Sequence, residues 1–301
     1  MIDLRRLLLL RELHARGTVA AVAEALAYSP SAVSQGLAAL QREAGVPLTE
    51  RVGRRLQLTE AGLRLVEHAD ALLERLEVAE AELQAAAGVV AGRVRVGALQ
   101  TPLLSLVPPA IIALGERHPG LRVELQELEP EVSLPAVALG ELEVAVAEEY
   151  DQAPRAIPRG LRREQLCRDP VRVVLPADHP LARSGDPVPL AALADETWAS
   201  GHSDTGFAAM LAGACRELGG FEPDIRHRCN DIAIMLALIQ SGACVGLLPR
   251  LGHPPGYPGV VARRAAERDL GRTIYAFHRR STTARPAVHA VIDALREAAP
   301  D

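Results

Sequence analysis

The chain has 301 residues, of which 49% are hydrophobic, and carries a formal net charge of −5 at neutral pH. This length and apolar content allow two or three domains with sizeable buried cores. The acidic balance excludes a uniformly basic nucleic-acid coat, although it is compatible with a local basic surface.

Neither the apolar runs nor the cysteines indicate a membrane or a metal site. Leucines 7–10 are fewer than the about 7–15 apolar residues of an export signal. No stretch approaches the ~20 residues of a membrane span, so we expect a soluble, cytoplasmic protein. The cysteines lack metal-ligand spacing and are interpreted as buried or incidental thiols. They are Cys167, Cys215, Cys229 and Cys244. We expect no cofactor and no bound metal.

Two short helices are expected at the start of the chain. The leucines between Leu4 and Leu10 give the first helix an apolar face, and Gly17 ends it as a C-terminal glycine does. Thr18 then caps a second helix, because the apolar residues of VAAVAEALA fall at helical spacing.

A third helix is expected to begin after a very short turn, in the segment SPSAVSQGLAAL at residues 29–40. Ser29 is its cap, and Pro30 occupies the first helical position, where the missing N–H costs least. Its apolar residues recur at i, i+4 and i+7 and face inward. Three short polar side chains are left on the outer face: Ser31, Ser34 and Gln35.

The second and third helices form a helix-turn-helix because so short a turn joins them. Short hydroxyl and amide side chains allow a helix to enter a major groove and to hydrogen-bond base edges. The alternative is a three-helix core whose third helix has an ordinary solvated face. The helices alone do not separate these two interpretations.

The segment that follows favours DNA binding. VPLTERVGRRLQLTEAG, residues 46–62, alternates apolar and polar residues about a VGR turn and is typical of a short hairpin. Arginines cluster on it at Arg51, Arg54 and Arg55. Residues 1–60 contain eight Arg against six Asp or Glu, whereas the remainder contains 25 Arg against 32 acidic residues. This local basic excess predicts a wing that neutralises phosphates.

From residue 13 to residue 62 the chain resembles the LysR-type transcriptional regulator family. The matching residues are LHARGTVAAVAEALAYSPSAVSQGLAALQREAGVPLTERVGRRLQLTEAG, without a gap. The resemblance implies a winged helix-turn-helix that binds an interrupted dyad on double-stranded DNA. The residues expected to contact DNA are Thr18, Ser29, Pro30, Ser31, Ser34, Gln35, Arg51, Arg54 and Arg55.

A long helix is expected from Thr59 to about Ala87. Its apolar residues are separated alternately by four and three positions, a heptad pattern that favours packing against a partner helix. The LysR resemblance implies the same, since linker helices of that family pair antiparallel in a dimer, and it implies a homotetramer of two dimers. The leucines expected at the dimer contact are Leu65, Leu72, Leu76 and Leu83.

Strand and helix patterns alternate beyond a flexible joint at residues 88–92. Strands at 93–98, 121–128 and 142–147 are separated by helices at 101–120 and 131–140. This βαβαβ order predicts a parallel sheet with helices on both faces. A second series follows from about residue 165, and its first strand is expected to begin at Pro170. A strand at 272–279 and a helix at 285–298 close the chain.

The two series resemble the two-lobed effector domain of the LysR family, which is similar in fold to periplasmic solute-binding proteins. We therefore expect an α/β protein with three parts. Residues 1–58 form the winged helix-turn-helix DNA-binding domain, 59–88 the linker and dimerisation helix, and 92–301 the effector-binding domain. Its first lobe comprises about 92–160 and 268–301, and its second about 161–267.

Polar residues follow three expected strands at the start of the next helix. In open α/β sheets, ligands bind beyond the carboxyl ends of strands, where helix N-termini favour anions. The residues at these junctions, expected to bind an effector, are Gln100, Thr101, Ser200, His202, Ser203 and Asn230. The alternative is that Thr101, Ser203 and Asn230 only cap their helices. A small polar or carboxylated effector is expected, because large aromatic residues are few.

The sequence thus predicts a cytoplasmic, sequence-specific DNA-binding transcription regulator that responds to a small-molecule effector. We expect it not to be an enzyme, because it contains no HExxH, GxSxG or Walker pattern and no GxGxxG after a strand. Two alternatives remain. One is a solute-binding protein or transport component, and the other is an enzyme built on the C-terminal lobes, such as a deaminase-like or prephenate dehydratase-like activity.

Overall fold

The computed structural model of the chain describes residues 1–53, 55–86, 88, 90–183, 185, 187–253 and 256–300, and for Arg55 only the backbone. The chain divides into two compact units, Met1–Ala87 and Gly88–Asp301.

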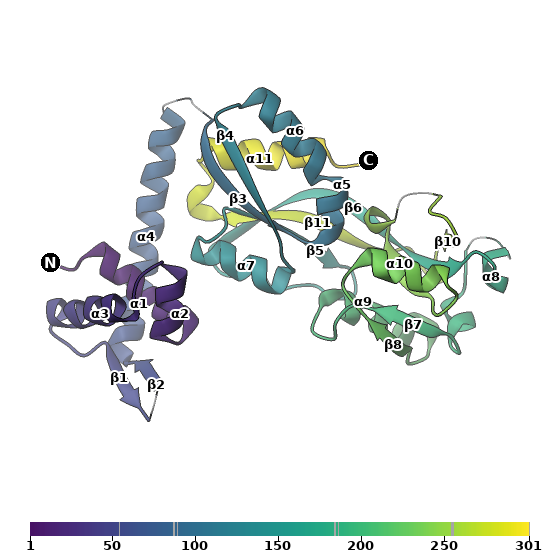
Figure 1. The fold of residues 1–301 in the computed structure, drawn as a ribbon, viewed down its shortest axis with the longest axis horizontal. Helices are drawn as coiled ribbons and strands as arrows, with labels where there is room; N and C mark the ends of the chain where they lie inside the picture. Colours follow the sequence, from purple (N-terminus) through teal and green to yellow (C-terminus); the bar gives the residue numbers. More distant parts are fainter. Residues whose placement is uncertain are drawn as a thin grey trace. The chain divides into compact units, whose positions relative to one another are not determined.

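The first unit contains the three expected helices, the hairpin and the long helix (Figure 1). Gly17 ends the first helix in the left-handed conformation, at φ 75°, and its N–H donates to the Leu13 carbonyl. Thr18 and Ser29 cap the next two helices, as expected. The bounds are α1 (Leu4–Arg16), α2 (Val19–Ala25), α3 (Pro30–Ala44), β1 (Thr49–Val52), β2 (Arg55–Leu58) and α4 (Glu60–Ala86).

The core of the first unit is built from the inward faces of α1, α2 and α3 with the first turns of α4. Gly62 shows how closely the start of α4 approaches the hairpin. A Cβ at this position would lie 2.1 Å from the carbonyl oxygen of Leu48. Because that oxygen belongs to the backbone, only glycine permits this contact.

The heptad leucines of α4 differ in their surroundings. Leu65 is partly buried against the core of the first unit. Leu72, Leu76 and Leu83 have exposed fractions of 51%, 43% and 73%. The first turns of α4 therefore pack within the unit, whereas its later turns present leucines at the surface.

The second unit is organised around a seven-stranded sheet with the order β10-β6-β11-β5-β3-β4, in which β9 also pairs with β6. Strands β4, β3 and β5 are parallel, whereas β11 pairs antiparallel with β5 and β6, and β9 and β10 pair antiparallel with β6. The bounds are β3 (Gly92–Ala98), β4 (Leu121–Glu127), β5 (Val144–Tyr150), β6 (Leu161–Pro176), β9 (Gly246–Pro249), β10 (Val260–Arg263) and β11 (Leu270–Arg279).

The parallel sheet expected from the first βαβαβ series is confirmed for β3, β4 and β5, and the antiparallel strands β6, β9, β10 and β11 extend it. Strand β11 returns to the sheet after the segment that contains β7 to β10, and it enters from the opposite end of the unit (Figure 1). It therefore lies antiparallel to β5. The expected start of β6 at Pro170 is wrong, because the strand begins at Leu161.

Helices cover both faces of the parallel part of the sheet (Figure 1). Val144 and Val146 of β5 pack in one core with α6 (Val107–Arg117) and α11 (Pro286–Glu297). Ala145 and Ala147, which point to the other face, pack with α7 (Pro130–Leu139). Successive side chains of this apolar strand thus point to opposite faces of the sheet and contribute to two separate cores.

The single helix expected at 101–120 is wrong, since two helices occupy this segment. They are α5 (Gln100–Ser105) and α6, with Leu106 between them. Pro108 and Pro109 have no N–H to donate to the carbonyls one turn earlier, so a continuous helix would lack those hydrogen bonds.

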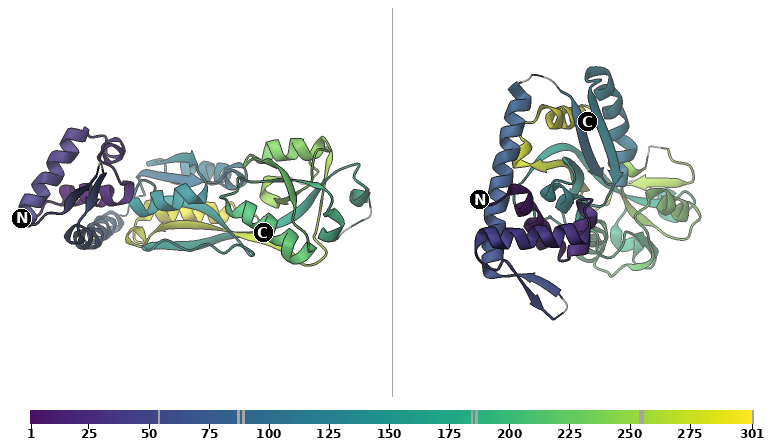
Figure 2. Two further views of the ribbon diagram at one scale, coloured as in Figure 1. Left: turned by 90° about the horizontal axis from the view of Figure 1, so that it is seen from below. Right: turned by 60° about the vertical axis from the view of Figure 1, so that its left-hand side comes forward.

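Strands β6 and β11 run lengthwise through the second unit (teal and yellow in Figure 2). The end opposite α6, α7 and α11 contains a two-stranded parallel sheet and several helices (Figure 1). Trp198, the sole tryptophan of the sequence, is buried in a core of this end. The bounds are α8 (Pro180–Arg183), β7 (Thr197–Ser200), α9 (Gly206–Ala214), β8 (Asp224–Arg228) and α10 (Ile232–Gln240). A π-helical turn continues α9 over Cys215–Gly219, and short 3-10 helices lie at Leu190–Leu193, Arg250–Gly252 and Arg280–Thr282.

Candidate functional site

The outer face of α3 carries the short polar residues that the sequence indicated. Ser31, Ser34 and Gln35 are exposed, because the apolar residues of α3 face the core. Gln35 Nε2 donates a hydrogen bond to Ser31 Oγ at 3.3 Å. An amide and two hydroxyls therefore lie together at the start of this helix, and they can donate to and accept from base edges.

Thr18, Ser29 and Pro30 shape the helix starts. The Thr18 side chain accepts a hydrogen bond from Ala21 N at 3.2 Å, and that of Ser29 accepts one from Ala32 N at 3.1 Å. Pro30 occupies the first turn of α3. A hydroxyl that accepts one hydrogen bond still carries a hydrogen to donate, so these caps can also contact a phosphate.

The hairpin places one of the expected arginines at the surface. Arg51 is exposed on β1, opposite Leu56 of β2. Arg54 lies outside the described residues, and only the backbone of Arg55 is described. The geometry of the wing therefore supports Arg51 as a phosphate contact.

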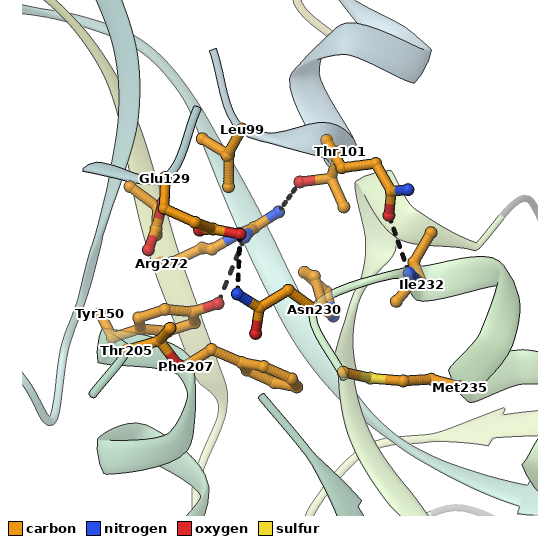
Figure 3. A pocket seen from close by; sticks show the side chains of 13 residues that line it. Leu99, Thr101, Glu129, Tyr150, Thr205, Phe207, Asn230, Ile232, Met235 and Arg272 are labelled. Carbon is orange, nitrogen blue, oxygen red and sulfur yellow. Dashed lines mark hydrogen bonds between the residues drawn. The ribbon is translucent and has the colours of Figure 1, made fainter. Parts of the chain in front are cut away.

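The second unit contains a pocket with about 480 Å³ of empty space, part of it open to solvent. Residues from α5, β5, α9, α10, β9 and β11 line it, together with residues between these elements (Figure 3). The lining residues are Leu99, Gln100, Thr101, Glu129, Glu148, Tyr150, Thr205, Phe207, Asn230, Ile232, Met235, Pro249 and Arg272.

A buried arginine on β11 organises one wall of this pocket. Arg272 Nε and Nη2 lie 2.9 and 2.8 Å from Asp169 Oδ2. Nη1 donates to the Tyr150 hydroxyl at 3.2 Å, and Nη2 donates to Thr101 Oγ1 (Figure 3). Asp169 also accepts from Leu251 N at 3.0 Å. This guanidinium is therefore paired and hydrogen-bonded within the protein.

Two carboxyl groups also line the pocket. Glu148 is 4% exposed, and burial raises its pKa to about 7, although Arg272 and Arg155 oppose the shift. Burial likewise raises the pKa of Glu129, which accepts a hydrogen bond from Asn230 Nδ2 at 3.0 Å. Desolvation disfavours the charged form of both groups.

Three of the six residues expected to bind an effector line this pocket. Gln100 Oε1 accepts a hydrogen bond from Ile232 N at 2.7 Å, so it joins α5 to the start of α10. Asn230 Oδ1 accepts one from His202 N at 2.9 Å. Gln100 and Thr101 at the start of α5 therefore meet Asn230, which precedes α10, at one site.

The other three expected residues do not line the pocket. Ser200 is fully buried at the end of β7, and His202 and Ser203 are exposed. The capping alternative is also wrong, because α9 is capped by Thr205 and α10 by Asp231, and α5 begins without a side-chain cap.

The sequence analysis missed every ionisable side chain that lines the pocket, namely those of Glu129, Glu148, Tyr150 and Arg272. Glu148 and Arg272 lie within strands rather than after them, so a search of strand ends does not find them. The signal for Glu148 was a pair of acidic residues inside the apolar run VAVAEEY. Glu129 follows β4 and precedes α7, so it lies at a strand-to-helix junction of the kind that also carries Thr101.

Within the described ranges, no group of three or more His, Cys, Asp or Glu side chains is arranged to hold a metal ion. None of the helices that the structure describes is long and apolar enough to cross a membrane.

Comparison with known families gives two matches along the chain. Residues 4–63 match the family "Bacterial regulatory helix-turn-helix protein, lysR family", and residues 87–300 match "LysR substrate binding domain". The second match alone covers more than half of the sequence.

Similar proteins span nearly the whole chain. A probable HTH-type transcriptional regulator, LrrA of Synechococcus elongatus, is 27% identical over 297 residues, which are 95% of this chain and 93% of LrrA. A probable hydrogen peroxide-inducible genes activator of Mycobacterium avium is 28% identical over 77% of this chain and 73% of its own length. The structure of a cysteine-to-aspartate variant of full-length OxyR from Pseudomonas aeruginosa has the same fold, with a TM-score of 0.72. The two sequences are 22% identical, and the match covers 98% of this chain and 95% of that chain.

Proposed function

Because the chain belongs to the LysR family of bacterial transcription regulators, which bind DNA and respond to small-molecule effectors, we propose that the outer face of α3 contacts operator bases and that the pocket of the second unit binds the effector. Its relatives are regulators rather than enzymes or solute-binding proteins.

The exposed polar face of α3 is the observation that carries the DNA-binding proposal. Ser34 and Gln35 contact base edges, since their short side chains let the helix approach the groove. Arg51, Arg54 and Arg55 neutralise phosphates. Thr18, Ser29, Pro30 and Ser31 lie at the helix starts and position the helix against the DNA backbone.

The pocket favours effector binding because it joins residues distant in sequence. Gln100, Thr101 and Asn230 belong to it, together with Glu129, Glu148 and Arg272. Its walls come from both proposed lobes, 92–160 with 268–301 and 161–267. A ligand held by both lobes binds one relative lobe arrangement better than another, and this difference can change the affinity for DNA.

The exposed leucines of α4 support assembly through this helix. Leu72, Leu76 and Leu83 form an apolar stripe at heptad spacing, and Leu65 continues it into the core of the first unit. We propose a dimer formed through residues 59–88, with a tetramer as a further assembly. The site of action is the cytoplasm, where operator DNA lies.

The thiols argue against a peroxide response of the kind named for the Mycobacterium avium relative. Burial raises the pKa of Cys167 and Cys244 to about 11 and that of Cys215 to about 12. Burial also raises the pKa of Cys229. Peroxide reacts with the thiolate, so thiols held protonated at neutral pH are poor sensors.

The proposal is tested by mapping the DNA that the full-length protein protects next to its own gene, with and without candidate metabolites. We expect two protected half-sites and a protection pattern that an active metabolite alters. Asn230→Ala should keep the protection and lose its alteration, whereas Gln126→Ala, an exposed residue of β4 that does not line the pocket, should change neither. The absence of any protected site would overturn the DNA-binding role, and an unchanged metabolite response in Asn230→Ala would place effector binding elsewhere.

A further inference from the structure

The charges around the pocket are not balanced. Arg272, the one lining arginine among the described residues, is paired with the buried Asp169. Arg155 lies next to the pocket, where its Nη2 donates to Glu131 Oε1 at 2.8 Å and lies 4.0 Å from Glu148 Oε1. Once these two pairs are formed, the carboxyl groups of Glu129 and Glu148 are left without a full cationic partner.

Glu148 provides a second, independent observation. Its Oε2 is buried and has no hydrogen-bond partner among the described residues. An unsatisfied buried acceptor is costly, and a carboxylate more so than a neutral group. The raised pKa of Glu148 has the same cause, because desolvation without a full partner favours the protonated form. A ligand that brings a positive charge and N–H donors would remove this cost.

Two of the helix N-termini at the pocket, those of α9 and α10, offer little to an anion, whereas that of the short helix α5 has no side-chain cap. The first N–H groups of α10 already donate to side chains: Ile232 N to Gln100 Oε1, and Ala233 N to Asp231 Oδ1. At α9, Ala208 N donates to Thr205 Oγ1. At α9 and α10 these interactions therefore occupy N–H groups that could otherwise bind a carboxylate or phosphate.

The remaining walls suit a short apolar or aromatic body. Tyr150 and Phe207 stack with ring centroids 6.3 Å apart, and Leu99, Ile232 and Met235 line other parts of the same pocket (Figure 3). Aromatic faces attract organic cations; the Tyr150 ring already has the Arg272 guanidinium over it, 5.7 Å from the ring centroid, so the aromatic contribution comes from Phe207.

We propose that the ligand of this pocket is a small organic cation, a protonated amine or amidinium on a short apolar body, recognised by Glu129 and Glu148. This inference rests on the proposed function of the pocket as the effector site, and it replaces the carboxylated effector that the sequence suggested.

The experiment compares benzylamine, benzyl alcohol and benzoate, together with butylamine, butanol and butanoate, as probes of matched shape. Each is titrated into the full-length protein, and the unfolding temperature and binding heat are measured. We expect the amines to stabilise the protein and the carboxylates to leave it unchanged, since ligands that bind only the native state raise its stability. Glu148→Gln and Glu129→Gln should each weaken amine binding about tenfold, because the charge-assisted contact is lost.

Glu164→Gln is the matched control, because this β6 residue pairs with Arg296 and does not line the pocket. Glu129 is partly exposed, so Glu129→Gln remains informative if Glu148→Gln fails to fold. The proposal is overturned if a carboxylate or alcohol binds as tightly as its matched amine. It is also overturned if amine binding is unchanged in both pocket variants, or if neither amine binds the wild type.

Failure of the ligand class and failure of the effector role give different results. If the amines bind through Glu129 and Glu148 but never alter DNA protection, the cationic ligand class stands and the regulatory role of the pocket fails. If an anionic metabolite alters DNA protection and Asn230→Ala abolishes that response, the regulatory role stands and the cationic class is overturned.

Discussion

Glu148 lies in the interior of β5, a strand whose other side chains pack mainly in apolar cores. Its pKa in the folded protein is raised to about 7 from an ordinary value of 4.5, chiefly by burial. A carboxyl group whose pKa is higher in the folded than in the unfolded protein contributes stability at pH values below its pKa in the unfolded protein. That contribution is lost as the pH rises through the folded pKa.

We therefore expect Glu148→Gln to remove a pH dependence between about pH 4.5 and 7. As the pH rises through this interval, the free energy of unfolding of the wild type should fall by about 3 kcal/mol more than that of the variant. Each unit of pKa shift corresponds to about 1.4 kcal/mol. Urea unfolding followed by the emission of Trp198 measures the difference. Equal pH dependence in the two proteins would mean that Glu148 has an ordinary pKa.

Gln35 and Arg51 are expected to contribute to DNA binding in different ways. Gln35→Ala should weaken specific binding by about 1–3 kcal/mol and relax the preference at one base pair, because a contact to a base edge is lost. Arg51→Ala should weaken all sequences alike and lower the salt dependence, because one phosphate contact is lost. Titrations of operator and unrelated DNA at several salt concentrations separate the two effects. A Gln35→Ala protein with unchanged affinity and preference would show that α3 does not contact bases there.

At the scale of single residues, the sequence predicted the groups that follow local rules. Ser29 and Thr18 were identified as caps because capping depends on neighbouring backbone N–H groups. Gln100, Thr101 and Asn230 were found because they follow strands. Arg272 could not be found in this way, since its partners Asp169, Tyr150 and Thr101 are distant in sequence and only the folded sheet brings them together.

At the scale of elements, local patterns predicted helices and strands well and failed where proline or a distant partner decides the outcome. Two prolines divide the segment that follows β3 into α5 and α6. The segment PVRVVLP was expected to form a strand that begins at Pro170, although proline is rare inside sheets. Pro170 lies inside β6, next to Val171, the residue at which β6 pairs with both β11 and β9. Strand pairing of this kind is not encoded in any short segment.

The exposed leucines of α4 lead to a prediction about assembly. Leu72→Asp or Leu76→Asp should leave each protomer folded, because both side chains are already exposed within the chain. In a dimer, the introduced aspartate would be buried between the two helices without a partner, which costs several kcal/mol. We expect sedimentation to show monomers and operator binding to be lost, since one half-site gives too few contacts. Leu104→Asp, an exposed leucine of α5, is the control. Dimers that persist in both α4 variants would contradict the proposed contact.

At the scale of the whole molecule, the second unit depends on β6 and β11, which run through both of its ends. Arg272 of β11 connects them through Asp169 of β6, and it also contacts Tyr150 and Thr101. Because the guanidinium and the carboxylate are both buried, the attraction between them offsets the desolvation cost of each charge. This pair therefore couples the stability of the pocket to that of the sheet.

Arg272→Met should destabilise the second unit by about 3–5 kcal/mol, because Asp169 would remain as a buried charge without its partner. Arg272→Met combined with Asp169→Asn should recover part of this loss, since the uncompensated charge is removed while the side-chain volume is kept. Urea unfolding reported by Trp198, which is fully buried in this unit, measures both variants. Arg122→Met, an exposed arginine of β4, is the matched control and should unfold with the wild type. Should Arg272→Met unfold at the wild-type urea concentration, the pair contributes nothing to the stability of the sheet, and the pocket owes its shape to apolar packing alone.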